Sequence, residues 1–334
     1  MASHSFFTDK EAEKRSFLFS QRGLVSVTSM FPAFLTTIFF ALSAIFATRS
    51  ARVLGAATAN LGRLCIALLL LGLWAHTAGQ GLRGASLGYF LASGLIGYGL
   101  GDVALFLAFT RIGPRLTMLL VHCLAVPCAA VAENLWLGTT MTVGQIVCVC
   151  ITLAGVCIAL TPIHSHKLTR GLFWGGTLFG VCASLGQAGG AVISRKAYQV
   201  AALSGLHMDG GTAAYQRMLG GILVGAAFAM ATRFFASSGE RTEESTAKKR
   251  SPELKKRAWL FVVLNAIAGP ALGVACFQWA LSISPSGIVL PIVATTPVVT
   301  IPLAYWMDGD RPSLRSIVGG VIAVTGTVAL ALQA

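Results

Sequence analysis

The chain carries little charge. Only 11% of its 334 residues are Asp, Glu, Lys or Arg, whereas 55% are hydrophobic and the mean hydropathy is +0.75. A soluble protein of this length could not bury that much apolar surface. The scarcity of charge therefore excludes a soluble globular protein and indicates a protein of the lipid bilayer.

Acidic residues are scarcer than basic ones, at 12 against 25, which gives a net charge of +13. An excess of basic residues can indicate a protein that binds nucleic acid. However, eight of the basic residues lie in the single segment 233–257, together with four glutamates. A run of mixed charge is typical of a solvated loop, and basic loops beside membrane spans are ordinary topology signals. We therefore expect no nucleic-acid partner.

Signatures of catalysis and of metal binding are also missing. None of the eight cysteines forms a Cys-x-x-Cys pair, and all lie in apolar runs as small buried residues do. There is no His-Glu-x-x-His motif, no serine nucleophile elbow and no Walker loop. We expect no catalytic residue, no metal and no cofactor, so any transport would depend on a gradient or on exchange.

What the chain does have is long apolar runs of about 20 residues, the length that a helix needs to cross a bilayer. The runs are continuous and not alternating, so they predict helices and exclude a membrane β-barrel. We predict an all-α integral membrane protein with ten transmembrane helices, at 29–47, 56–76, 88–110, 116–137, 143–162, 172–194, 212–232, 258–281, 287–307 and 316–333.

The two halves of the chain resemble each other. Thr58 precedes Arg63 at the start of one apolar run, and Thr212 precedes Arg217 with the same spacing in another. The stretch from Gly138 to Gly155 is also as long as the one from Gly309 to Gly326. Five spans in each half are an odd number, so the second half would be inverted, as in transporters built for alternating access.

These repeats set the predicted domain organisation. We expect the first helix to be uncleaved, and not the apolar core of a signal peptide, because the second half contains a matching segment. The predicted parts are a polar segment 1–28, a first five-helix repeat 29–162, a linker 163–171, and a second five-helix repeat 172–333 that contains the charged loop 233–257.

Polar residues inside the predicted spans are candidates for the solute or proton pathway. A charge at the centre of a span costs roughly 2.5–3.5 kcal/mol on insertion scales. Asp102 could bind a cation, exchange a proton, or form a structural pair with an arginine or a helix terminus. Phe106 lies one turn further on the same face, as suits a cavity wall. His122 is either a hydrogen-bonded helix contact or a proton relay.

Other candidates have two interpretations each. Arg63 and Arg217 either extend to the lipid headgroups or act as paired gate residues or anion contacts. Glu133 lies near the end of a span, at the interface or in a gate or proton pathway. Three further residues could bind a zwitterionic or aromatic solute by hydrogen bonds or stacking, although the tryptophan could equally face lipid: Asn265, Gln278 and Trp279.

Three segments carry a resemblance to a known family. They are Gly99–Arg115, Pro127–Gly155, and Gly269–Leu281 with the Gly309-Asp-Arg-Pro turn that follows. Together they resemble the EamA-type members of the drug/metabolite transporter superfamily. The first-helix Trp-Gly of that family is Ala41-Leu-Ser here, and its Gly-Glu-Arg turn is Gly138-Thr-Thr in the first half. The resemblance implies a ten-helix exporter or permease for small organic metabolites or drugs.

We therefore predict a secondary transporter of the inner membrane, acting as a monomer or homodimer on a small solute, with proton coupling as a further hypothesis. The alternatives are a lipid-modifying membrane enzyme and a non-transporting receptor or assembly factor.

Two signals disagree on the side of the membrane on which the termini lie. Seven basic residues lie on the side of the termini and sixteen on the other, which places the termini outside, whereas the resemblance places them in the cytoplasm.

Overall fold

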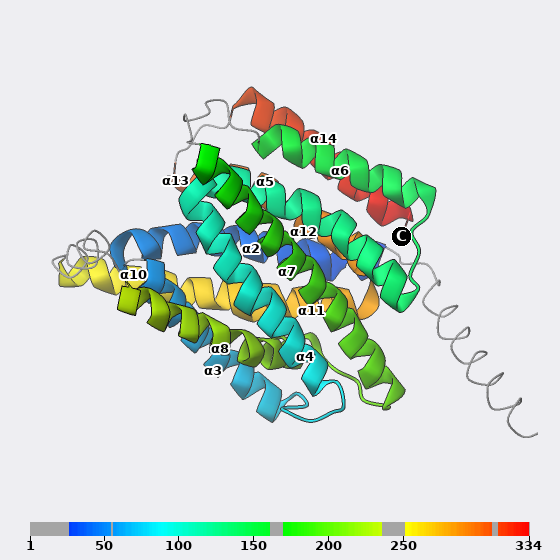
Figure 1. Cartoon of the computed structure of the whole chain (residues 1–334), viewed down its shortest axis with the longest axis horizontal. Coiled ribbons are helices and arrows are strands. Elements are labelled where there is room, and N and C mark those ends of the chain that lie inside the picture. The colour runs from blue at the N-terminus through cyan, green and yellow to red at the C-terminus, as the bar shows by residue number, and fades with distance from the viewer. Residues whose placement is uncertain (1–26, 55, 161–169, 236–250, 309–312, 334) are drawn as a thin grey trace, which may run out of the picture.

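The computed structural model describes residues 27–54, 56–160, 170–235, 251–308 and 313–333, and helices are the regular secondary structure of these residues (Figure 1). Most of the predicted segment 1–28 and of the linker 163–171, the middle of the charged loop 233–257 and the turn at Gly309 lie outside the described residues.

The helices of the first half are α2 (Val27–Leu54), α3 (Ala56–Thr77), α4 (Leu87–Gly94), η1 (Leu95–Gly101), α5 (Asp102–Leu137) and α6 (Val143–Leu160). Those of the second half are α7 (Arg170–Leu203), α8 (Gly210–Phe235), α10 (Pro252–Ala266), η2 (Ile267–Gly273), α11 (Val274–Ile283), α12 (Ser286–Val293), α13 (Thr296–Asp308) and α14 (Leu314–Gln333).

Eight helical stretches of the described chain are long and apolar enough to cross a membrane. They coincide with eight of the ten predicted spans. The other two predicted spans, 88–110 and 212–232, are also helical, in α4 to α5 and in α8. The all-helical membrane class is thus confirmed, whereas the number of ten spans stays a prediction.

One boundary differs from the prediction. The predicted break between residues 110 and 116 is helical, because α5 continues from Asp102 to Leu137. In Figure 1 the ribbon of α4, η1 and α5 bends back on itself instead of ending. Pro114 lies in this region, and proline bends a helix without necessarily ending it. In an apolar environment a helix also gives backbone N–H and C=O groups hydrogen-bond partners that they would lack in a loop.

Glycines bring the helices of the two halves close together. A Cβ atom at Gly186 of α7 would lie 2.7 Å from Cα of Gly101, and one at Gly190 would lie 3.1 Å from Cα of Gly97. The backbones of η1 and α7 therefore touch, which is the role expected of small residues four apart in membrane helices. A Cβ atom at Gly225, by contrast, would have no neighbour within 4 Å in the described part of the chain.

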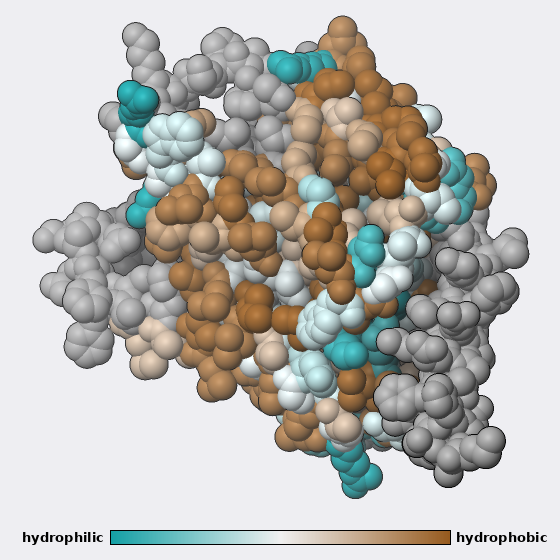
Figure 2. Space-filling view, turned by 45° about the vertical axis from the view of Figure 1, so that its right-hand side comes forward, coloured by the Kyte–Doolittle hydropathy of each residue, from teal (hydrophilic) through white to brown (hydrophobic). Residues whose placement is uncertain are grey.

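The outer surface is strongly apolar. Large side chains such as Leu135 and Trp306 are 84% and 85% exposed, and Figure 2 shows apolar residues over much of one face. Such a surface is costly in water and is the one that lipid chains cover.

The segments η1 and η2 occupy equivalent places in the two halves. Each is a seven-residue π-helical turn that continues an α-helix, and each has glycine at its third and seventh positions: Gly97 and Gly101, Gly269 and Gly273. π-Helical turns insert an extra residue into a helix and often occur at functional sites. They therefore draw attention to the helices that follow them, α5, which begins with Asp102, and α11, which contains Gln278.

Candidate functional site

Charged residues from three helices converge beside η1. Asp102, the first residue of α5, lies within electrostatic range of Arg63 on α3 and Arg217 on α8. Tyr98 of η1 lies within range of the same three side chains. We call Arg63, Tyr98, Asp102 and Arg217 the central polar cluster. The two arginines of the repeated sequence marker thus lie within electrostatic range of the same carboxylate, which the sequence alone does not show.

Arg217 is the most enclosed member of this cluster. Its side chain is 4% exposed, and its guanidinium carbon lies 5.0 Å from the ring centroid of Tyr98 and 6.0 Å from that of Phe277. Aromatic faces attract a guanidinium group. The Arg217 side chain is thus enclosed by protein side chains, and its role as a gate residue or anion contact stays a prediction.

Arg217 also has unused hydrogen-bond donors. Its Nε and Nη1 atoms are buried without an acceptor among the described residues. A buried polar group without a partner costs about 1–3 kcal/mol, more when it is charged. Arg63 differs in this respect, because it is half-buried and its Nε donates to Oδ1 of Asn60 at 2.7 Å. The donors of Arg217 are therefore the ones available to a ligand or to water.

Further unpartnered polar atoms lie nearby. Gln278 of α11 follows Phe277, and both its Oε1 and its Nε2 are buried without a partner among the described residues. The hydroxyl of Tyr198 on α7 is in the same condition, and Tyr198 lies within electrostatic range of Arg217. The ring of Tyr198 packs edge-on against Phe90, with centroids 5.1 Å apart. Donors and acceptors on α7, α8 and α11, all of the second half, are thus left without partners among the described residues.

Glu133 takes part in a separate polar group, buried between α5, α7 and the junction of α11 with α12. Nε of Arg195 donates to Oε1 of Glu133 at 3.1 Å. The backbone N–H of Ser286 donates to Oε2 at 2.6 Å, and the Ser286 hydroxyl donates to the same oxygen. Nη1 of Arg195 donates to the carbonyl of Leu281 at 2.7 Å. Glu133 lies near the end of the span Leu120–Leu137, as predicted, and forms a buried ion pair between the two halves there. Its role as a gate or in a proton pathway stays a prediction.

Sequence reasoning missed Arg195 altogether. The predicted span 172–194 ends one residue before it, and a charge directly after an apolar run indicates a loop. In the structure α7 continues to Leu203, and the Arg195 side chain is buried. The same omission applies to Tyr98, Tyr198 and Phe277, because aromatic residues in an apolar span give no signal of their own.

The remaining predicted residues are dispersed. Asn265 accepts a hydrogen bond from Ser43 Oγ at 2.6 Å and joins α10 to α2. His122 is buried in α5, and Trp279 is 45% exposed on α11. Phe106 lies in α5, but its side chain is outside the described part of the chain. In the described ranges, no three His, Cys, Asp or Glu side chains form a group that could hold a metal ion.

A third polar site lies outside the spans, between α7 and α8. Asp209 precedes α8, and its Oδ1 accepts hydrogen bonds from the backbone N–H of Thr212 and from Trp74 Nε1, both at 2.9 Å. Its Oδ2 accepts a bond from the Thr212 hydroxyl at 2.5 Å. Partial burial raises the pKa of Asp209, but these bonds and one from the backbone of Gly211 outweigh it, so the net pKa lies below its usual value. Asp209 thus caps α8 and ties it to α3.

Comparison with known proteins agrees with this architecture. The model of the EamA-like transporter family matches residues 27–161 and 174–332, one match in each half. A protein of known crystal structure superimposes with a TM-score of 0.69 at 16% identity, over 92% of this chain and 98% of that one, which shows a shared fold. No curated protein sequence matches. The chain is therefore an integral multi-pass membrane protein and belongs to the EamA-like transporter family.

Proposed function

We propose that the protein is a secondary transporter that moves a small organic solute across the inner membrane by alternating access. Its two halves would be inverted five-helix repeats that enclose the central polar cluster. The observation that carries this proposal is the buried Arg217 guanidinium, whose Nε and Nη1 have no acceptor among the described residues. A buried charge with free donors is costly, and a ligand that supplies acceptors removes the cost.

The charges of the cluster favour a solute with a carboxylate. Arg63 and Arg217 carry two positive charges against the single negative charge of Asp102. A guanidinium group binds a carboxylate through parallel hydrogen bonds. The rings of Tyr98 and Phe277 beside Arg217 would enclose the apolar part of the solute, and the amide of Gln278 would add a hydrogen bond.

The Glu133–Arg195 ion pair is proposed as a gate. It links α5 of the first half to α7 and to the α11–α12 junction of the second half. In alternating access the contacts that close one end must break when that end opens. An ion pair satisfied by several hydrogen bonds suits such a contact, because it has a well-defined closed geometry. Proton coupling through Asp102, Glu133 or His122 is part of the same proposal.

Uptake into proteoliposomes tests this function. The purified protein would be supplied with a panel of labelled carboxylates, amino acids, nucleosides and cationic drugs, and each would be compared with empty liposomes. We expect a carboxylate-bearing solute to be transported, and Arg217→Gln to lower its uptake about tenfold or more, the loss typical of one charged hydrogen-bond partner.

Arg83→Gln is the matched control, because Arg83 is exposed in the turn between α3 and α4. It should transport like the unmodified protein. Transport of a carboxylate solute at an unchanged rate by Arg217→Gln would overturn the assignment of the solute site, and failure to transport any solute of the panel would overturn the proposed solute class.

A further inference from the structure

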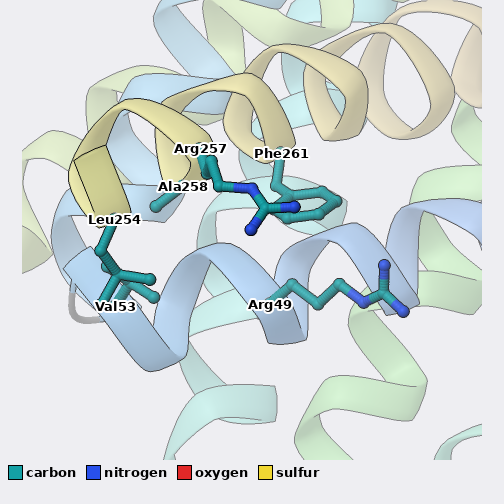
Figure 3. A pocket seen from close by; sticks show the side chains of 6 residues that line it. All are labelled: Arg49, Val53, Leu254, Arg257, Ala258 and Phe261. Atoms are coloured by element: carbon teal, nitrogen blue, oxygen red, sulfur yellow. The ribbon is translucent and has the colours of Figure 1, made fainter. Parts of the chain in front are cut away.

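A small pocket lies between α2 and α10, away from the central polar cluster. Its volume is about 250 Å³, and it is lined by Arg49, Val53, Leu254, Arg257, Ala258 and Phe261 (Figure 3). The pocket thus combines two guanidinium groups with an apolar wall. We propose that it binds an anionic phospholipid, with the phosphate between Arg49 and Arg257 and an acyl chain along α10.

The depth of the two arginines agrees with a lipid phosphate. Arg49 lies close to the end of the membrane span Met30–Ala51, and Arg257 lies close to the start of the span Pro252–Ile283. Both are within about two helical turns of a span end, where the headgroups of a bilayer begin. The pocket is therefore at the height of the phosphates and not in the hydrocarbon core.

The geometry of the site is held by packing. On α10 the residues Leu254, Arg257 and Phe261 recur at helical spacing, and so face α2 together. The ring of Phe261 stacks on Phe46 with centroids 6.1 Å apart, and the guanidinium carbon of Arg49 lies 5.3 Å from the Phe261 centroid. Contact with an aromatic face holds the Arg49 guanidinium at the wall of the pocket, where its charge contributes to attracting a phosphate.

The surroundings favour a lipid over free phosphate. Beside the pocket, α10 also presents apolar side chains to the outside, since Trp259 and Leu260 are 43% and 57% exposed. An acyl chain could lie on them while its phosphate stays in the pocket. The neighbouring Lys255 and Lys256 add positive charge against the single Glu253, and basic residues at the membrane surface attract anionic lipids.

Lipid-dependent thermal stability tests this proposal in the detergent-purified full-length protein. We expect phosphatidylglycerol to raise the unfolding temperature more than phosphatidylcholine, which carries a phosphate but no net charge. The double variant Arg49→Gln/Arg257→Gln should bind phosphatidylglycerol about tenfold more weakly, as the loss of charge-assisted hydrogen bonds to phosphate implies. Arg83→Gln is the control and should keep the preference.

Two results would overturn the proposal: equal effects of the two lipids, or an unchanged preference in the double variant. An equal effect of inorganic phosphate would show that the pocket takes the free anion instead of a lipid. Should the double variant not fold, a photoactivatable phosphatidylglycerol on the unmodified protein gives the answer, since its crosslinks must map to α2 and α10. None of these measurements depends on solute transport, so they stay separate from the proposed function.

Discussion

Nε of Arg195 lies 3.1 Å from Oε1 of Glu133, and both side chains are buried between the two halves of the molecule. Each also bonds a helix end near the α11–α12 junction, Glu133 through Ser286 of α12 and Arg195 through Leu281 of α11. The ion pair therefore fixes α5 of the first half against three helices of the second, α7, α11 and α12.

Removing one member of this pair should be more harmful than removing both. Arg195→Met leaves the Glu133 carboxylate buried without its cation, which typically costs about 3–5 kcal/mol. The double variant Glu133→Gln/Arg195→Met removes both charges and should recover part of that loss. Thermal unfolding of the purified variants measures this, and losses that simply add would show that the two side chains are not coupled.

Proton coupling makes a second prediction. If one of the three titratable residues in the spans carries the proton, its uncharged replacement should remove the stimulation of uptake by a pH gradient. The variants are Asp102→Asn, Glu133→Gln and His122→Gln, and the measurement is uptake with and without the gradient. We expect Asp102→Asn to have the largest effect, because Asp102 lies within electrostatic range of Arg63 and Arg217. Three variants that respond to the gradient like the unmodified protein would exclude proton coupling through these residues.

The sequence predicts the class of the molecule well, because bilayer thickness imposes a length on every span. It predicts the convergence of side chains poorly. The apolar character of the sequence ends at residue 194 and predicts the end of the span there, although α7 continues through Arg195 to Leu203. The helix can continue there because Glu133 and the Leu281 carbonyl receive the charge, and both are distant in sequence.

The central polar cluster shows the same limit. Asp102 and Arg217 are conspicuous as charges in apolar runs, but their proximity depends on the close approach of η1 to α7 and α8. That approach in turn requires Gly97, Gly101 and Gly186. The glycines are visible in the sequence, whereas the pairing of their faces is a tertiary property.

Asp209 should make stability depend on pH in the acid range. Its folded pKa lies below its usual value, so the unfolded chain binds the proton more readily. Its stabilising contribution is thus complete above the usual pKa of about 3.9 and is lost as the pH falls from there through the folded pKa. Asp209→Ala should cost about 1 kcal/mol at neutral pH, as loss of a helix cap does. Asp209→Asn, which keeps an acceptor, should cost less and should lack this acid dependence. Thermal unfolding as a function of pH distinguishes the two variants, and identical acid profiles for the unmodified protein and Asp209→Asn would contradict the assignment.

Two glycines of α8 provide a matched test of helix packing. A Cβ at Gly220 would overlap the carbonyl oxygen of Leu91 on α4 and would lie 2.9 Å from its carbonyl carbon. A Cβ at Gly225 would have no neighbour within 4 Å among the described residues. Gly220→Ala must therefore push α8 away from α4, at a cost of about 1–3 kcal/mol, while Gly225→Ala should be neutral or slightly stabilising because alanine favours helix.

The same displacement should reach the solute site. Arg217 lies one turn before Gly221 on α8, and a Cβ at Gly94 of α4 would overlap its carbonyl oxygen. The α4–α8 contact thus positions the backbone that carries Arg217. We expect Gly220→Ala to lower solute uptake as well as unfolding temperature, and Gly225→Ala to change neither. Equal behaviour of the two variants in both measurements would mean that the close approach of α4 and α8 does not hold Arg217 in place.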